Sequence, residues 1–226
     1  MYEQINLSET PSLKQLVYDH LLRQIVSGDL PPNTRLMEAD ISKAMNVSRA
    51  PIREALNMLE RDGFTKIIPH KGSVVAEVTM QNVYEIWEIR CVLEPYVAKA
   101  SCNLIPKKRL QAIRHTLTKL EAHPDRFDEY IESDYAVHNI LYEYHTNEYL
   151  KNILEKLKAH SVRMRWITER QRKSPSMCLV SIKEHQSIID ALLAGEPDQV
   201  YNAVYTHLLN SKDRLIEAIG SFSNGK

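Results

Sequence analysis

The residues best suited to chemistry are one aspartate and three histidines that fall on the apolar faces of three expected helices. Asp134 and His138 lie four residues apart in a helix expected over residues 126–145, so both side chains project from the same face. His185 and His207 lie among isoleucines, leucines and valines in two later helices. Burying such groups without partners costs several kcal/mol, so we expect them either to pair with one another or to bind something.

These four side chains together predict a site for a divalent metal ion. Neutral imidazole and carboxylate are good ligands for zinc and other first-row ions, and a pair at i, i+4 presents two donors to one point. Zinc is the favoured ion, and nickel, manganese and iron are alternatives. The competing interpretation is a set of hydrogen-bonded core histidines, which is the commoner role of any single histidine on an apolar face.

A second group of residues has the composition of a DNA-binding surface. The 226-residue chain has 29 Lys+Arg and 29 Asp+Glu, so its formal net charge is zero and a contact with DNA must depend on local charge. Between Lys43 and Lys71 there are six basic and three acidic residues. Arg49 and Arg53 project from one side of an expected helix near its start, and the planar fork of an arginine can donate two hydrogen bonds to guanine.

Other polar residues around this helix extend the predicted surface. The amides at the helix start can hold a phosphate together with Ser48, while Arg35 and Lys43 would anchor the DNA backbone. A glycine-containing loop between two β-branched runs would approach the duplex closely. The alternative is an ordinary solvated face. The predicted DNA-binding residues are Arg35, Lys43, Ser48, Arg49, Pro51, Arg53, His70, Lys71 and Gly72.

The elements that must position these residues are mainly helices. Three helices are expected before Asp62-Gly63, and they are followed by a hairpin with strands at 64–68 and 73–78. From Thr79 to about Gly220 the pattern is helical throughout and predicts six helices. The breaks between them fall near residues 105–106, 123–124, 146–147, 174–175 and 195–197.

Composition narrows the class of protein. With 43% apolar and 26% charged residues, the chain can bury a sizeable core and is not expected to be disordered or fibrous. Its three cysteines are widely spaced, which argues against a disulfide framework and favours a reducing cytoplasm. No run of about 18 apolar residues and no secretory signal is present, so a soluble cytoplasmic protein is expected.

The N-terminal part resembles a known family. Its residues Gly28-Asp29-Leu30-x-Pro32-x-x-Arg35-Leu36, followed by Ser48-Arg49-x-Pro51-Ile52-Arg53-Glu54-Ala55-Leu56, are similar to the DNA-binding domain of GntR-type bacterial regulators. The resemblance covers about residues 13–78 and implies a winged helix-turn-helix. One departure is Lys71, at a wing position where such domains usually have arginine.

The C-terminal part resembles the FCD effector-binding domain. The motifs are Glu88-x-Arg90-x-x-Leu93-Glu94, Asp134-x-x-x-His138, Asn147-x-x-Leu150, Glu184-His185-x-x-Ile188 and Ala203-x-x-x-His207-Leu208. In the metal-containing members an aspartate and three histidines bind a metal at the base of a pocket, and a small carboxylate often completes the coordination. The resemblance therefore implies that Asp134, His138, His185 and His207 are the metal ligands.

Four further residues are predicted to bind the effector. Arg90 would enter a pocket that prefers anions and bind the carboxylate of the effector there. An ion pair with Glu94, four residues later in the same helix, is an equally good explanation of this arginine. Arg163 and Arg165 could line the same pocket or lie on the exposed side of their helix. The predicted effector-binding residues are Arg90, Glu94, Arg163 and Arg165.

The sequence therefore predicts a mainly α protein. A winged helix-turn-helix domain at residues 1–78 would precede an all-helical, six-helix antiparallel bundle at residues 79–226 that binds metal and effector. The predicted function is that of a ligand-responsive, DNA-binding transcription regulator, homodimeric because two recognition helices must reach a two-fold operator. The alternatives are a metal-dependent hydrolase, or a regulator in which the metal is purely structural.

Overall fold

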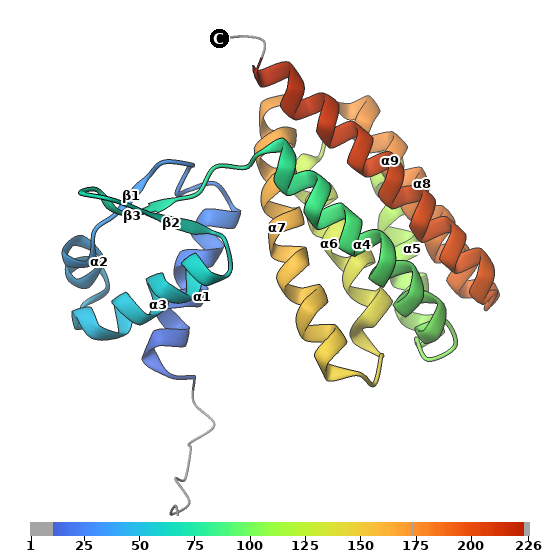
Figure 1. Ribbon diagram of the computed structural model, residues 1–226. Coiled ribbons are helices and arrows are strands. Elements are labelled where there is room, and N and C mark those ends of the chain that lie inside the picture. Colours follow the sequence, from blue (N-terminus) through green and yellow to red (C-terminus); the bar gives the residue numbers. More distant parts are fainter. Residues whose placement is uncertain (1–10, 173, 224–226) are drawn as a thin grey trace, which may run out of the picture. The chain divides into compact units, whose positions relative to one another are not determined.

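The structure, a computed structural model, describes residues 11–172 and 174–223 and divides into two compact units (Figure 1). The first unit is Met1–Glu77 and the second is Val78–Lys226. Each unit has its own buried core, and the two are described separately below.

Three helices form most of the first unit. They are α1 (Leu13–Val26), α2 (Glu38–Met45) and α3 (Arg49–Arg61). Ser12 caps α1, because its side chain accepts a hydrogen bond from the backbone N–H of Gln15. The turn between α2 and α3 is tight because Asn46 adopts a left-handed conformation with φ of 52°, which asparagine tolerates better than most residues do.

A small antiparallel sheet completes the first unit. Strands β2 (Thr65–Ile68) and β3 (Gly72–Val75) form the predicted hairpin, and β1 (Arg35–Leu36) pairs with the other edge of β3, which gives the order β1-β3-β2. The sequence did not predict β1, because two residues carry no periodic signal. The strand expected over 73–78 ends at Val75. Three helices followed by this hairpin make a winged helix-turn-helix.

The core of the first unit depends on one face of α3. The side chains of Ile52, Ala55, Leu56 and Leu59 are all buried, as their predicted stripe requires. This face packs mainly against α1, where Val17, Leu21 and Ile25 are also buried. The polar side of α3 is thereby left exposed.

The described residues of the second unit form six helices, and the predicted breaks between them are confirmed. Thr79 begins the first of them with a capping box, in which Thr79 and Asn82 each bond to the backbone of the other. Pro175 is the first residue of the fifth of these helices, a position where its missing N–H removes no intrahelical hydrogen bond. The helices are α4 (Met80–Ser101), α5 (Lys107–Ala122), α6 (Phe127–Glu143), α7 (Glu148–Arg172), α8 (Pro175–Ala194) and α9 (Pro197–Ser223).

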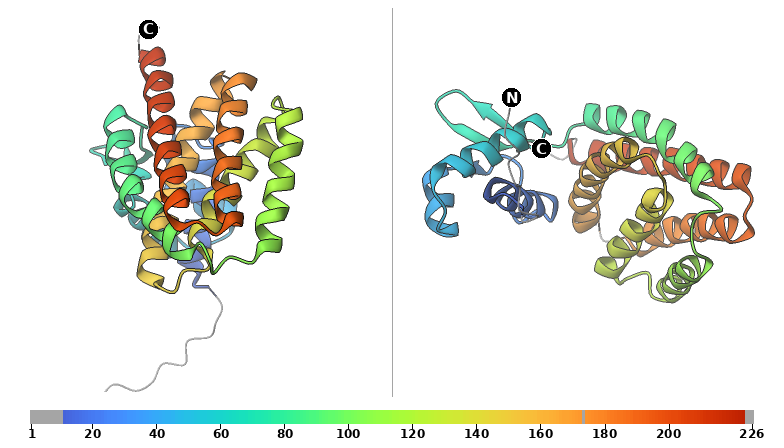
Figure 2. Two further views of the ribbon diagram at one scale, coloured as in Figure 1. Left: turned by 90° about the vertical axis from the view of Figure 1, so that its right-hand side faces the viewer. Right: turned by 90° about the horizontal axis from the view of Figure 1, so that it is seen from below.

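These helices pack side by side around one apolar core (Figure 2). α6 contacts α4, α5, α7 and α8, and α9 contacts α4, α7 and α8. Residues from all of these helices bury their apolar stripes against one another, which is the usual way for amphipathic helices to remove apolar surface from water. The mainly α fold class is confirmed. None of the helices described is long and apolar enough to cross a membrane.

The apolar core of the second unit should respond strongly to truncation. Leu117 is fully buried in the same cluster as Trp87, so Leu117→Ala should lower the free energy of unfolding of this unit by about 2–5 kcal/mol. Urea denaturation followed by tryptophan fluorescence measures the change. Leu104→Ala is the matched control, because Leu104 is half exposed and its truncation should cost less than about 1 kcal/mol. Equal effects of both substitutions would contradict this view of the core.

Candidate metal centre and DNA-binding surface

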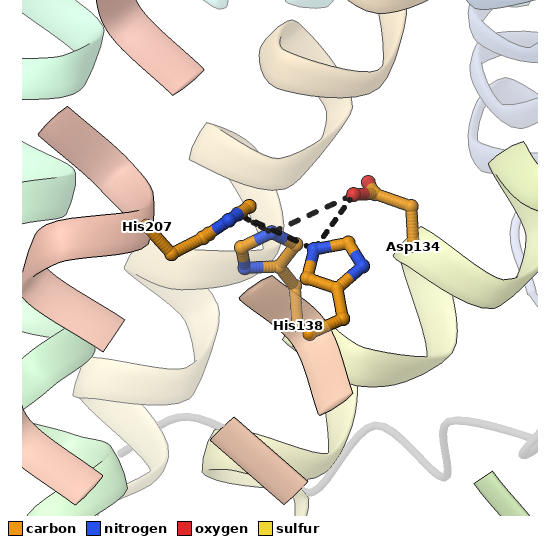
Figure 3. A group of neighbouring side chains, drawn as sticks. Asp134, His138 and His207 are labelled. Atoms are coloured by element: carbon orange, nitrogen blue, oxygen red, sulfur yellow. Dashed lines mark hydrogen bonds and ion pairs between the residues drawn. The ribbon is translucent and has the colours of Figure 1, made fainter. Parts of the chain in front are cut away.

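The four predicted ligands come together inside the second unit. Asp134 and His138 from α6, His185 from α8 and His207 from α9 each offer one ligand atom, and these atoms all lie within 4.8 Å of one another. Figure 3 shows Asp134, His138 and His207 pointing toward a common point. The Nε2 atom of His207 lies 3.3 Å from the Nε2 atoms of both other histidines, and the Nε2 atom of His185 lies 3.2 Å from Oδ1 of Asp134.

The cluster is almost completely buried. The exposed fractions are 4% for Asp134, 5% for His138, 0% for His185 and 1% for His207. Burial, together with the charges of His207 and His138, lowers the pKa of His185 well below its usual value. Burial also lowers the pKa of His207 to about 4, although its hydrogen bond to Glu184 opposes the shift. Both imidazoles are therefore neutral near pH 7, which is the state that binds metals.

The outer side of His138 faces an ion pair on α4. Its Nδ1 atom lies 2.8 Å from Oε2 of Glu94, and Glu94 pairs through its other oxygen with Arg90. Burial alone would raise the pKa of Glu94, but the charge of Arg90 and the contact with His138 hold that pKa well below its usual range. Glu94 is therefore an ionised, buried carboxylate.

The outer side of His207 has a similar neighbour. Its Nδ1 atom lies 2.8 Å from Oε2 of Glu184. The two oxygens of Glu184 also accept hydrogen bonds from Arg214, and Oε1 accepts one from Asn210. Burial opposes ionisation of this carboxyl group, but the hydrogen bonds from His207 and Arg214 lower the pKa of Glu184 to about 2. Sequence reasoning noted Glu184 in the family motif but did not assign it to the site.

Asp134 pairs with an arginine from α7. Nη1 of Arg165 donates to Oδ1 of Asp134, and Nη2 of Arg165 donates to the hydroxyl of Ser211 on α9 at 3.2 Å. Arg165 is buried, with an exposed fraction of 5%. The sequence left two positions open for Arg165, one lining the effector pocket and one on the exposed side of its helix. The structure supports the interior position, beside the cluster of Asp134 and the three histidines.

The remaining predicted effector residues are also buried. Arg90 pairs with Glu94, as the alternative interpretation of this helix expected, yet its Nη1 atom has no hydrogen-bond partner among the residues described. Nε1 of Trp87, whose ring lies 4.6 Å from the Arg90 guanidinium carbon, is likewise buried without a partner there. Arg163 is buried on α7, and burial lowers its pKa to about 10. The indole N–H of Trp87 was not predicted to be a functional donor, because the apolar ring of this residue fits the buried face of the helix.

The predicted DNA-binding residues of the first unit gather around the start of α3. Ser48 is the N-cap residue, and its side chain makes no capping hydrogen bond. Ser48, Arg49 and Lys43 are exposed, and Pro51 lies half-buried in the first turn of α3. Arg53 is also exposed, but it makes a two-point ion pair with Glu38 of α2, with N–O distances of 2.8 and 2.9 Å.

The wing carries the rest of this surface. His70 and Lys71 lie in the turn between β2 and β3, and Gly72 is the first residue of β3; both His70 and Gly72 have positive φ values, of 64° and 78°. Nε of Arg35 donates a hydrogen bond of 2.6 Å to the backbone oxygen of Lys71. The structure therefore brings Arg35 to the wing, which sequence separation alone could not show.

Comparison with known proteins fits this geometry. The family described as bacterial regulatory proteins of the gntR family matches residues 13–75, and the FCD domain matches residues 85–210, more than half of the chain. The chain belongs to the GntR family and carries an FCD domain. It is a DNA-binding transcription regulator of the GntR/FCD type, and regulators of this family typically dimerise, while FCD domains bind effector ligands.

Relatives of this GntR/FCD regulator match over nearly their whole length. The HTH-type transcriptional regulator YdfH of Escherichia coli O6:H1 is 30% identical over 210 residues, which cover 92% of this chain and 91% of YdfH. The HTH-type transcriptional repressor RspR of Escherichia coli K12 is 29% identical over the same lengths. The solved structure of E. coli McbR/YncC has the same fold, with a TM-score of 0.78 and 20% identity over 92% of this chain and 99% of that one.

This membership decides against the metal-dependent hydrolase considered as an alternative. The matching families and the relatives are transcription regulators, not enzymes. The buried cluster of Asp134, His138, His185 and His207 therefore lies in a regulatory protein and not in an enzyme.

The ion pair between Asp134 and Arg165 gives a direct test of this buried polar site. In protein treated with a chelator, Asp134→Ala should lower the free energy of unfolding by about 3–5 kcal/mol, because it leaves the buried guanidinium without this carboxylate. The double variant Asp134→Ala/Arg165→Met should recover much of that loss. Urea denaturation measures both. An Asp134→Ala variant as stable as the unsubstituted protein would show that the pair is not formed.

Proposed function

We propose that this regulator senses a small carboxylate through a divalent metal bound by Asp134, His138, His185 and His207. The metal and the effector occupy the FCD domain, residues 79–226, and the winged helix-turn-helix, residues 1–78, binds a two-fold DNA operator as part of a homodimer. Binding of the effector changes how strongly the dimer binds DNA. Because its target is DNA in a bacterial cell, the protein works in the cytoplasm.

The spacing of the ligand atoms is the observation that carries the metal proposal. Ligand atoms about 2.05 Å from a tetrahedral zinc ion lie about 3.3 Å from one another. The distances of 3.3 Å between imidazole nitrogens and of 3.2 Å from His185 to Asp134 are close to this value. Three nitrogens and one oxygen at this spacing fit zinc best, although nickel, manganese and iron also accept this donor set. A bound metal supplies a Lewis acid to which an effector oxygen can coordinate.

Unpartnered donors near the cluster support an effector with acceptor oxygens. Buried N–H groups are almost always hydrogen-bonded, so Nη1 of Arg90 and Nε1 of Trp87, which lack partners among the described residues, indicate a ligand or ordered water. Arg165 and Arg163 add buried positive charge on α7. A carboxylate would accept hydrogen bonds from these donors, and an arginine fork suits it well.

DNA binding is assigned to the exposed residues of the first unit. Arg49 and Arg53 lie in the first turns of α3, the recognition helix in a helix-turn-helix, and face away from its buried stripe. Lys43 and Ser48 would contact phosphates, together with Arg35 and Lys71 at the wing. Two copies are needed because the recognition helices of a dimer read two half-sites about one turn of DNA apart.

Helix α4 connects the residues proposed to bind metal and effector to the DNA-binding unit through the polypeptide chain. It begins at Met80, with four residues between it and the end of β3, and Arg90 and Glu94 on its buried side contact His138. A ligand that favours one position of His138 therefore acts on the helix that continues directly from the wing. Such regulation requires that the ligand binds two states of the protein with different affinities.

Substitution of Arg49 tests the DNA-binding assignment. Arg49→Ala should weaken binding to the cognate operator by about 10-fold to 100-fold, because one two-point contact to guanine is worth about 1–3 kcal/mol. Fluorescence anisotropy with operator and scrambled duplexes measures affinity and sequence preference together. Arg61→Ala is the control, since Arg61 is an exposed arginine in the last turn of the same helix. An unchanged sequence preference in Arg49→Ala would contradict the assignment.

Metal analysis tests the sensing half of the proposal. Protein purified without chelators should contain about one divalent metal per chain, whereas His185→Gln should bind the metal much more weakly, because it replaces one of the four ligands with a poor one. Inductively coupled plasma mass spectrometry measures the metal content. The control is His115→Gln, which replaces an exposed histidine on α5 and should retain the metal. Metal-free wild-type protein would refute the site.

The same preparations separate a sensory metal from a structural one. With a sensory metal, small carboxylates should raise the melting temperature of the loaded protein and should have no effect after chelation. If chelation lowers the melting temperature but leaves the response to carboxylates unchanged, the metal is structural.

A further inference from the structure

We propose that Glu94 and Glu184 are positioning residues that orient two of the histidines for metal binding. This inference rests on the metal site of the proposed function. It concerns the side of each histidine that faces away from the cluster, where a carboxylate from a different helix lies 2.8 Å from Nδ1.

Each carboxylate fixes which nitrogen carries the proton. An ionised carboxylate can only accept a hydrogen bond, so the short contact requires Nδ1 of each imidazole to carry a proton when that imidazole binds a metal through Nε2. The Nε2 atoms of His138 and His207 then hold lone pairs, and they face each other at 3.3 Å. Two lone pairs at that distance form no hydrogen bond, and a cation between them removes the repulsion.

An arginine lies behind each of these carboxylates. Arg90 pairs with Glu94 on the same helix, and both side chains are nearly inaccessible to solvent. Arg214 donates to both oxygens of Glu184, at 2.9 and 2.7 Å. Nη2 of Arg90 also lies 3.3 Å from Nδ1 of His138, but it lies near Oε2 of Glu94 as well, and the shorter carboxylate contact determines the Nδ1 proton. The arginines hold the carboxylates in place and keep them charged.

The third histidine provides a contrast within the same site. Nδ1 of His185 is buried and has no hydrogen-bond partner among the residues described. Among these residues no carboxylate orients the His185 ring from its outer side, whereas His138 and His207 are held there by charged networks that reach α4 and α9. The geometry assigns the orienting role to Glu94 and Glu184 specifically, and not to buried polar residues in general.

Affinity for Co²⁺ tests this role in the full-length chain. Loss of a carboxylate that orients a ligand typically weakens metal binding by about 10–100-fold, so Glu94→Gln and Glu184→Gln should each show a loss of this size in competition with a chelator. Their visible Co²⁺ absorption spectra should also differ from that of the wild type, because the imidazole ligands become less basic. Glu155→Gln is the matched control, since Glu155 binds Tyr142 and Lys158 and not a histidine.

Thermal melting of the metal-free variants separates positioning from a purely structural role. Variants that melt at lower temperature but bind Co²⁺ with wild-type affinity and spectrum would overturn the inference. If Glu94→Gln fails to fold because Arg90 is left buried, Glu184→Gln decides, since its carboxylate and arginine are both partly exposed. Wild-type protein that binds no Co²⁺ would refute the metal site itself, and the inference with it, before any variant is compared.

Discussion

The need to compensate buried charge governs the second unit of this protein. Asp134, Glu94 and Arg165 are removed from water in the centre of a helical bundle, where an unpaired ion would be far more costly than the apolar contacts around it could offset. Each carboxylate therefore has an arginine beside it, and each of these arginines comes from a helix adjacent to the cluster. The pair of Arg165 and Asp134 joins α7 to α6, and the pair of Arg214 and Glu184 joins α9 to α8, so these contacts add to apolar packing in positioning the helices.

The same network explains why the four candidate metal ligands can remain close together in a buried core. Burial keeps His185 and His207 neutral, and the carboxylates next to His138 and His207 occupy the nitrogens that face outward. The inward nitrogens are thus free to bind a cation. A buried polar cluster of this kind is less favourable for stability than apolar side chains would be, and the proposed metal binding accounts for its presence.

In the proposed regulation, an event inside the FCD domain acts on α4, the first helix after the wing. This helix carries the ion pair that contacts His138, and it carries Nη1 of Arg90 and Nε1 of Trp87, which have no hydrogen-bond partner among the described residues. The first unit has a simpler design, in which an apolar stripe of α3 builds the core and its opposite side presents arginines.

Much of this protein could be predicted from its sequence. Helical periodicity, caps and proline breaks located all six helices of the second unit, and the i, i+4 spacing placed Asp134 and His138 on one buried face, because these signals are local along the chain. The two-residue strand β1 was missed, since pairing with β3 gives so short a segment its structure. Tertiary structure alone decided which partners the buried groups meet: Arg165 with Asp134, Arg35 with Lys71, and Glu94 and Glu184 with their histidines. These pairs join residues 23 to 44 positions apart, and only packing of whole helices and strands determines such contacts.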